Sequence, residues 1–163
     1  MVITHFLVNY IPRLKLFLYM SLETGLESLK RGEFVLLFDS AGRENEIDMV
    51  VAAELITPEH VARMRQNAGG LLCIALENNF AKSLELQYMH DILSNSSISN
   101  KEMIMGLAPY GDYPTFSLSV NHYQTYTGIT DKDRALTIME MANIYKVDNK
   151  QKKFVSSFKT PGH

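Results

Sequence analysis

The sequence predicts an α/β (α+β) protein in which a mixed sheet is sandwiched by helices. Short continuous apolar runs, typical of buried strands, alternate along the chain with segments whose apolar residues recur at helical spacing. The chain has 163 residues, of which 46% are hydrophobic. This length suffices for one domain core but not for two sizeable ones.

The first third of the chain predicts a helix followed by two strands. Three leucines at helical spacing indicate the helix: Leu22, Leu26 and Leu29. Gly32 is placed to end this helix. Residues 34–38 form a continuous apolar run, as in a strand buried on both faces, and a second run covers residues 49–53.

A second helix is expected after a capping residue, a first-turn proline and an early acid: Thr57, Pro58 and Glu59. Its buried side is expected to carry Val61, Met64 and Ala68. Gly69 and Gly70 are placed to end it, and residues 71–76, which include Cys73, form another candidate inner strand.

The second half of the chain predicts a long loop, a strand and a helix. Residues 94–113 are rich in Ser, Asn, Gly and Pro and predict the loop. In residues 116–120, apolar side chains alternate with serines, which is strand periodicity. Residues 131–145 predict a helix with four residues on its apolar side: Ala135, Ile138, Met139 and Ala142.

Charge and cysteine content exclude several classes of protein. Sixteen Lys and Arg residues against eighteen Asp and Glu residues leave a formal charge of -2, so no nucleic-acid partner is expected. The single cysteine, Cys73, excludes an internal disulfide and any multi-cysteine zinc or iron–sulfur site. We therefore expect a cytoplasmic protein with no membrane partner.

Residues 1–19 are expected to form an N-terminal extension ahead of a second start-like residue, Met20. Polar residues interrupt the extension, so it does not reach the roughly 18–20 uninterrupted apolar residues of a membrane span. It also lacks the early positive charge and the Ala-x-Ala cleavage site of a signal peptide. A docked strand or an amphipathic arm is the alternative.

The segment between the first two strands carries the chemistry. Four carboxylates fall within residues 39–48, beside a single arginine, Arg43. The four are Asp39, Glu44, Glu46 and Asp48. Close carboxylates attract a hard divalent cation and can serve in acid–base catalysis, while an arginine can clamp a phosphate. We expect a mobile acidic loop at the mouth of a site, and the alternative is a solvated charged turn.

Residues 43–48 have the sequence Arg-Glu-Asn-Glu-x-Asp and follow a strand that ends in Asp39. This run resembles the acidic loop of 3,4-dihydroxy-2-butanone 4-phosphate synthase, a riboflavin-pathway enzyme. Further blocks follow in the family's order, at residues 49–53, 56–60, 68–73 and 127–134. The likeness covers residues 22–163, is closest to archaeal members, and implies the synthase fold.

The resemblance implies a metal-dependent lyase that converts D-ribulose 5-phosphate to formate and L-3,4-dihydroxy-2-butanone 4-phosphate. By similarity, Glu44 is the ligand of Mg²⁺ or Mn²⁺ and contacts the sugar together with Arg43. Asp48 corresponds to a sugar-contacting aspartate, and Asp39 and Glu46 are supporting acids. Such a reaction needs a base and a Lewis acid at the same carbons, because a proton leaves next to a ketone.

The resemblance also places Cys73 at the pocket wall, although a lone cysteine in an apolar strand is otherwise a core residue. Thr127 and Arg134 are expected near the phosphate, with helix capping and a surface ion pair as the alternatives. His163 matches a histidine important in many members, and at the end of the chain we expect it to be mobile. The family implies a homodimer. The other histidines are expected to be structural or exposed: His5, His60, His90 and His122.

Family members continue past the Pro-Gly-His of residues 161–163, so residues 20–163 would be the N-terminal part of a single synthase domain. Their second half carries an Arg-x-x-Gly-His-Thr-Glu stretch, in which the histidine is a metal ligand and the arginine and threonine hold phosphate, and beyond it a catalytic glutamate. Two functions therefore compete: the lyase, and a truncated, non-catalytic fragment that binds a sugar phosphate or forms dimers. A third class is another metal-dependent phosphosugar isomerase, which product identity would distinguish.

Overall fold

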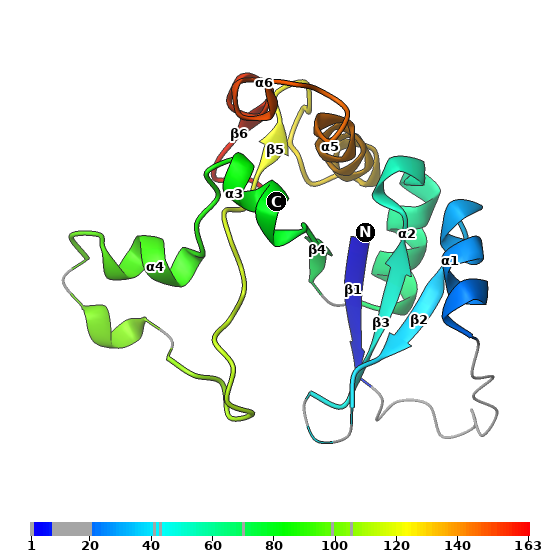
Figure 1. Cartoon of the computed structure of the whole chain (residues 1–163), viewed down its shortest axis with the longest axis horizontal. Coiled ribbons are helices and arrows are strands. Elements are labelled where there is room, and N and C mark those ends of the chain that lie inside the picture. Colours follow the sequence, from blue (N-terminus) through cyan, green and yellow to red (C-terminus); the bar gives the residue numbers. More distant parts are fainter. Residues whose placement is uncertain are drawn as a thin grey trace.

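Figure 1 shows a four-stranded sheet with α1 and α2 beside it, and a second region, built from α3, α5, α6 and two short strands, beyond one end of the sheet. The computed structural model describes residues 2–7, 21–40, 42, 44–69, 71–98, 100–104 and 106–163. In that part of the chain, no helix combines the length and the apolar composition needed to cross a membrane.

The strands are β1 (Val2–Leu7), β2 (Val35–Phe38), β3 (Glu46–Val51), β4 (Leu72–Ile74), β5 (Asn121–His122) and β6 (Phe158–Lys159). The α-helices are α1 (Leu22–Lys30), α2 (Pro58–Asn67), α3 (Asn78–Ser83), α4 (Met89–Ser94), α5 (Asp131–Ile144) and α6 (Lys150–Ser157). Two short 3-10 turns are η2 (Ala53–Leu55) and η3 (Lys101–Met103).

The larger sheet has the strand order β2-β3-β1-β4, and each neighbouring pair is antiparallel. The predicted α+β class is confirmed, with the difference that the ladders between described strands are antiparallel rather than mixed. β3 and β4 run in the same direction and are joined through α2, which is the usual connection between parallel strands. Because β1 lies between them and runs the opposite way, both contacts become antiparallel.

β1 comes from the segment predicted to be an extension. Its first residue, Val2, lies opposite Val51 of β3 on one side and opposite Ile74 of β4 on the other. This is the docked strand that the sequence left open as an alternative. Residues 8–20 lie outside the described part of the chain.

The expectation that residues 34–38 are buried on both faces is wrong. Among the described strands β2 is an edge strand that pairs with β3 alone, and three of its four side chains are exposed, with Leu36 at 64%. A continuous apolar run indicates a strand, but it does not reveal whether neighbouring elements cover the two faces.

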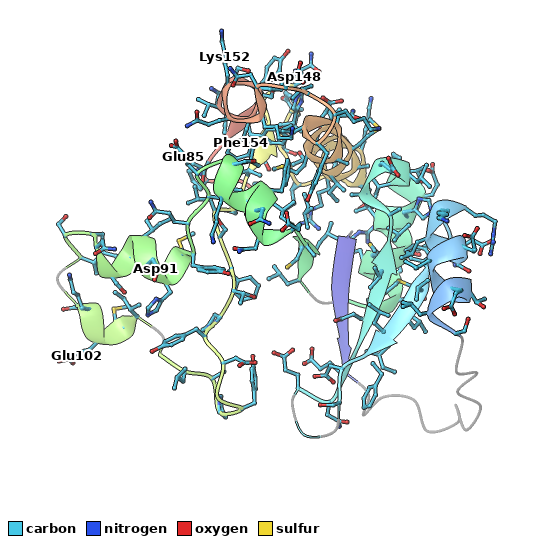
Figure 2. All side chains as sticks on the ribbon, in the orientation of Figure 1. Glu85, Asp91, Glu102, Asp148, Lys152 and Phe154 are labelled. Atoms are coloured by element: carbon cyan, nitrogen blue, oxygen red, sulfur yellow. The ribbon has the colours of Figure 1, made fainter. Side chains whose placement is uncertain are left out.

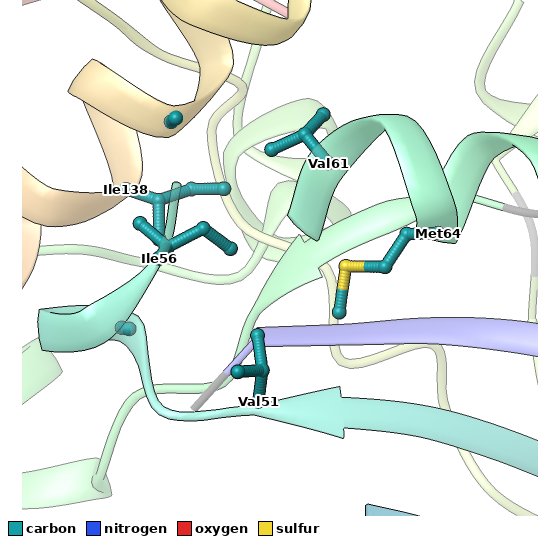
Figure 3. Close-up of a cluster of buried hydrophobic side chains, with 7 residues drawn as sticks. Val51, Ile56, Val61, Met64 and Ile138 are labelled. Carbon is teal, nitrogen blue, oxygen red and sulfur yellow. The ribbon is translucent and has the colours of Figure 1, made fainter. Parts of the chain in front are cut away.

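The first core cluster fills the space between the sheet and two helices, α2 and α5 (Figure 3). Its buried members are Val51, Ala53, Ile56, Val61, Met64, Ala135 and Ile138. The predicted start of α2 is confirmed, because the Thr57 hydroxyl accepts the His60 N–H (3.3 Å). The His60 ring accepts the Thr57 N–H at Nδ1 (3.1 Å), so its Nε2–H donates to the Gly32 carbonyl (3.0 Å). His60 therefore has a structural role: it ties the start of α2 to the end of α1.

A second core cluster lies on the other side of α5. Its buried members are Phe80, Leu84, Met141, Ile144, Phe154 and Phe158, which come from α3 and the residue after it, α5, α6 and β6. The predicted helix at residues 131–145 is confirmed, and Ala135 and Ile138 are buried as expected. The prediction for Met139 is wrong, because it is 36% exposed: the buried surface of α5 extends from Ala135 and Ile138 toward Met141 and Ile144, and Met139 lies outside it.

The strand predicted at residues 116–120 is absent, and the ladder begins only at β5. Residues 116 and 117 are instead bound to the segment that leads into α4. The Phe116 carbonyl accepts the Met89 N–H (2.7 Å), and the Ser117 hydroxyl donates to the Gln87 carbonyl (2.7 Å). Residues 116–120 alternate apolar side chains with serines, but they pair with no described strand and therefore form an irregular segment. In the long loop predicted at residues 94–113, the described residues form η3 and the end of α4 and are otherwise irregular.

We predict that Met64→Ala lowers the free energy of unfolding by about 2–5 kcal/mol, because it leaves a cavity in the first core cluster. Met64 is 1% exposed. Urea denaturation followed by circular dichroism measures the change. Met103→Ala is the matched control, because Met103 is 80% exposed and its loss should change stability by less than about 0.5 kcal/mol. Equal losses in the two variants would contradict the assignment of the core.

Candidate active site

The acidic turn, residues 39–45, connects β2 to β3. The carboxylate of Asp39 closes this turn. Asp39 accepts the Glu44 N–H at Oδ2 (2.8 Å) and the Glu46 N–H at Oδ1 (3.0 Å). Asn45 has a φ of 56°, in the left-handed region that asparagine tolerates. The expected loop at residues 39–48 is therefore shorter, because Glu46 and Asp48 belong to β3. Arg43 lies outside the described residues.

Asp48 and Cys73 share one face of the sheet. Asp48 lies opposite position 5 of β1 and Cys73 lies opposite position 3, so the two side chains lie on the same face. Glu46, two residues before Asp48 on the same strand, shares this face. Met49 and Val51 have the opposite orientation and pack into the first core cluster. The register therefore groups two predicted acids with the predicted pocket cysteine.

The Cys73 thiol is half-buried and protonated at neutral pH. Burial raises the pKa of the thiol, and the negative charge of Asp48 raises it further. A protonated thiol is a poor nucleophile. In this position Cys73 can shape a site or donate a weak hydrogen bond, but it is not activated for covalent chemistry.

The acidic turn offers oxygen donors suited to a hard divalent cation. Glu44 is half-buried in the turn, and Glu46 and Asp48 follow on β3. Among the residues described, no three His, Cys, Asp or Glu side chains are grouped closely enough to form a metal cage. Mg²⁺ needs no such cage, because it often takes one or two protein carboxylates and completes its shell with water and substrate oxygens. The donor set therefore fits an open magnesium site that contains Glu44.

A second group of predicted residues lies at the start of α5, where the buried carboxylate of Asp133 holds a turn. Asp133 accepts the backbone N–H groups of Tyr126 (3.3 Å), Thr127 (3.1 Å) and Gly128 (3.0 Å). Burial raises the pKa of Asp133, but hydrogen bonds from this turn and from Thr130 lower it more, and the net pKa lies below its usual range.

The structure changes the interpretation of Thr127 and Arg134. The residue that caps α5 is Thr130, not Thr127, and the Thr127 hydroxyl donates to Asp133 (3.4 Å). The surface ion pair at this helix start joins Arg65 to Asp131 (2.9 Å). The Nε of Arg134 is buried and has no hydrogen-bond partner among the described residues. Among the described residues Arg134 forms no salt bridge, although its charge helps to lower the pKa of the neighbouring Asp131.

His163 is docked rather than mobile. Its backbone N–H donates to the Oδ1 of Asn121 (2.8 Å), and the Gly162 N–H donates to the Ser119 hydroxyl (3.2 Å). Asn121 belongs to β5, and its contact with His163 could not be predicted from the sequence, because an asparagine there carries no distinctive signal. Asp133 could have been found, since an acid in the first turn of a helix often accepts backbone N–H groups.

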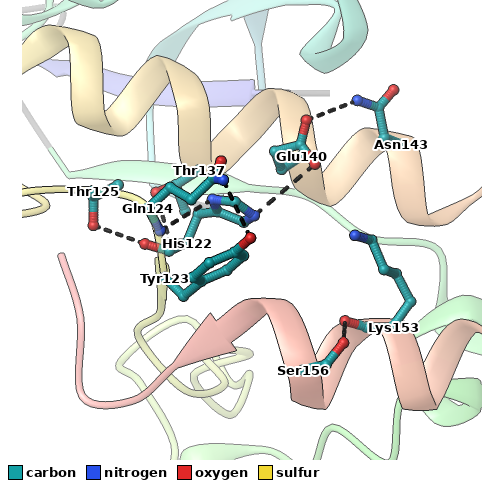
Figure 4. A network of polar contacts seen from close by, with 9 residues as sticks. All are labelled: His122, Tyr123, Gln124, Thr125, Thr137, Glu140, Asn143, Lys153 and Ser156. Atoms are coloured by element: carbon teal, nitrogen blue, oxygen red, sulfur yellow. Dashed lines mark hydrogen bonds and ion pairs between the residues drawn. The ribbon is translucent and has the colours of Figure 1, made fainter.

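β5 is itself anchored on α5 through His122 (Figure 4). The His122 N–H donates to the Thr137 hydroxyl (3.1 Å), and its Nε2 lies 4.0 Å from Glu140. Burial lowers the pKa of His122, Glu140 acts in the opposite direction, and Lys153 lowers it again, for a net decrease. His122 is therefore a structural histidine, as expected.

The predicted site residues thus form two groups. The acidic turn lies at the lower end of the sheet in Figure 1. The second group belongs to the start of α5 and the end of the chain, which lie beyond the upper end. A cavity of about 360 Å³ lies where η2, the end of β4 and α5 meet, lined by residues that include Ala53, Ile74 and Met141. None of the predicted site residues lines this cavity.

The sequence model of the 3,4-dihydroxy-2-butanone 4-phosphate synthase family matches residues 23–163. A synthase of this name from Methanothermobacter thermautotrophicus is 44% identical over 147 residues, which cover 87% of this chain and 63% of the relative. Riboflavin biosynthesis protein RibBA of Bacillus cytotoxicus is 33% identical over 87% of this chain and 30% of its own length. A solved structure of a 3,4-dihydroxy-2-butanone 4-phosphate synthase in complex with two magnesium ions has a TM-score of 0.66 and 29% identity, over 89% of this chain and 58% of that one.

The antiparallel sheet and its helices define an α+β protein, and the match over residues 23–163 defines its family. The chain belongs to the 3,4-dihydroxy-2-butanone 4-phosphate synthase family, which confirms the resemblance seen in the sequence. It spans 63% of the length of the archaeal relative and 58% of the magnesium-bound structure.

We predict that Asp133→Asn destabilises the chain at pH 7 and that the difference from the wild type shrinks in acid. Because the folded pKa of Asp133 is depressed, its contribution is complete above the unfolded pKa of about 3.9 and is lost as the pH falls through the folded pKa. Urea denaturation between pH 7 and pH 3 measures the difference.

Asp131→Asn is the control for loss of a charge at the same helix start. It removes a charge from the first turn and the contact with Arg65, which is worth less than about 1 kcal/mol, but none of the hydrogen bonds that Asp133 accepts. A difference between wild type and Asp133→Asn that stays constant down to pH 3 would contradict the role of the Asp133 carboxylate.

Proposed function

We propose that this chain serves the dihydroxybutanone phosphate synthase reaction as a metal-dependent lyase. The proposed reaction converts D-ribulose 5-phosphate to L-3,4-dihydroxy-2-butanone 4-phosphate and formate, in riboflavin biosynthesis. The observation that supports it most is the grouping of Glu46, Asp48 and Cys73 on one sheet face beside the turn that carries Glu44. Membership of the family supplies the substrate class.

The acidic turn is proposed as the place of the chemistry. Glu44 would hold Mg²⁺ or Mn²⁺, and the two magnesium ions of the related structure support this choice. When bound, such an ion polarises the carbonyl and hydroxyl oxygens of the sugar. Asp48 and Glu46 would accept and return protons next to the ketone, while the protonated Cys73 thiol forms part of the wall.

The phosphate is proposed to bind Arg134, with Thr127 and His163 nearby. The buried Nε of Arg134 supports this choice, because a guanidinium donor without a described partner favours an anion. Arg43 would contact the sugar together with Glu44, by family resemblance. We further propose that the protein is a cytoplasmic homodimer, as the family implies.

The second candidate is a non-catalytic fragment that binds a sugar phosphate or forms dimers. It is favoured by the separation of the two groups of site residues (Figure 1), because catalysis needs base, cation and phosphate anchor around one substrate.

We predict that Glu44→Gln abolishes binding of Mg²⁺ or Mn²⁺ without unfolding the chain. The substitution keeps the side-chain volume and removes the charge that a hard cation requires. Isothermal titration calorimetry with each metal measures the affinity, and circular dichroism checks the fold. Glu102→Gln is the matched control, since Glu102 is an exposed glutamate of η3, remote from the sheet (Figure 2). Equal affinity in wild type and Glu44→Gln would contradict the assignment of Glu44 as ligand.

We predict that residues 1–163 alone release formate from ribulose 5-phosphate at least about 10²-fold more slowly than a chimera. The chimera joins this chain to the remaining part of the archaeal synthase. The physical reason is positioning: a cation or phosphate displaced by about 1 Å can cost on the order of 10² in rate. The formate assay measures both proteins.

A chimera that carries Glu44→Gln is the control and should be inactive. Equal activity of the short chain and the chimera would show that the chain itself supplies every group needed. A chimera that binds the sugar phosphate without turnover would favour the second candidate function.

A further inference from the structure

The side chain of Asn121 makes two contacts with the same residue. Its Oδ1 lies 2.8 Å from the backbone nitrogen of His163, and its Nδ2 lies 3.4 Å from the Nδ1 of the His163 ring. A carboxamide has one accepting end and one donating end, so the two contacts together indicate which ring nitrogen of a neutral His163 carries the proton.

The backbone contact sets the orientation of the carboxamide. The His163 N–H can only donate, so the atom that faces it must be the Oδ1 of Asn121. The NH₂ group of Asn121 therefore faces Nδ1 of the ring. Because an NH₂ group can only donate, Nδ1 must accept, and in the neutral ring the proton resides on Nε2.

Close backbone packing holds this arrangement in place. Gly128 has a φ of 81°, and a Cβ there would overlap the Asn121 carboxamide. A Cβ at Gly162 would overlap the backbone of Val120 and Asn121. The Asn121 side chain is thus confined between the turn held by Asp133 and the chain that carries His163.

We propose that Asn121 is a positioning residue that holds His163 in the tautomer with its proton on Nε2, so that the ring presents an N–H donor to an oxygen of the substrate. The role of His163 toward substrate rests on the proposed function, but the effect of Asn121 on the tautomer does not. A neutral imidazole fixed in this way acts as a hydrogen-bond donor, as neutral histidines do toward carbonyl oxygens in other enzymes.

The test is nitrogen NMR of the ¹⁵N-histidine-labelled chain at a pH where the ring is neutral. Protonated and unprotonated ring nitrogens resonate far apart, and comparison with His163→Gln assigns the signals among the five histidines. Asn121→Asp keeps the side-chain size but makes both ends acceptors, so Nδ1–H should become the major tautomer. Asn121→Ala should lower the ratio of the Nε2–H to the Nδ1–H form on the order of 2- to 10-fold, as expected for loss of one ordinary hydrogen bond.

Ser119→Ala is the control for docking of the segment alone. It removes the bond to the Gly162 N–H and leaves the ring contact intact, so the tautomer ratio should match the wild type. An unchanged ratio in Asn121→Asp would overturn the proposal, and so would an equal change in Ser119→Ala. Formate release is not part of this readout, so an inactive chain would leave the result on Asn121 standing.

Discussion

Burial of α5 on two sides is the constraint on which the rest of the structure depends. Ala135 and Ile138 pack against the sheet and α2, whereas Met141 and Ile144 pack against α3, α6 and β6. One helix therefore contributes buried residues to both core clusters, and Ile74 of β4 also packs against both. Its first turn positions residues 126–128 through Asp133, and its middle anchors β5 through Thr137. The positions of Thr127 and Arg134, which are proposed to lie near the phosphate, therefore depend on how α5 packs in both clusters.

Carboxylates of the family motifs divide into structural and chemical groups. Asp39 and Asp133 accept backbone N–H groups at 2.8–3.3 Å and close the turns that carry their neighbours. For Asp133 the hydrogen bonds from its turn lower the pKa, which makes its carboxylate a poor base. Glu44, Glu46 and Asp48 lie next to Asp39 and are the acids proposed for metal binding and proton transfer. Structural acids of this kind explain why an acidic motif need not be catalytic at every position.

The lyase requires a base, a cation and a phosphate anchor around one substrate, whereas a non-catalytic fragment does not. The acidic turn and the start of α5 lie apart in this chain, and the chain spans 63% of the archaeal relative. The sheet face that carries Asp48 and Cys73 ends at β2, an edge strand with exposed apolar side chains. Such an edge can pair with further polypeptide, either from the same protein or from another copy.

The sequence by itself determined the features that depend on residues a few positions apart. These include the Thr57 cap, the limits of α5, the acidic turn and the family motifs, because capping and periodicity are local. Only the tertiary structure decided that β1 lies between β3 and β4, that β2 is exposed, that residues 116–120 lack a ladder, and that Asn121 holds His163. Each of these depends on a partner far away in the sequence. The same apolar run or asparagine can be buried, exposed or bound according to which distant segment packs beside it.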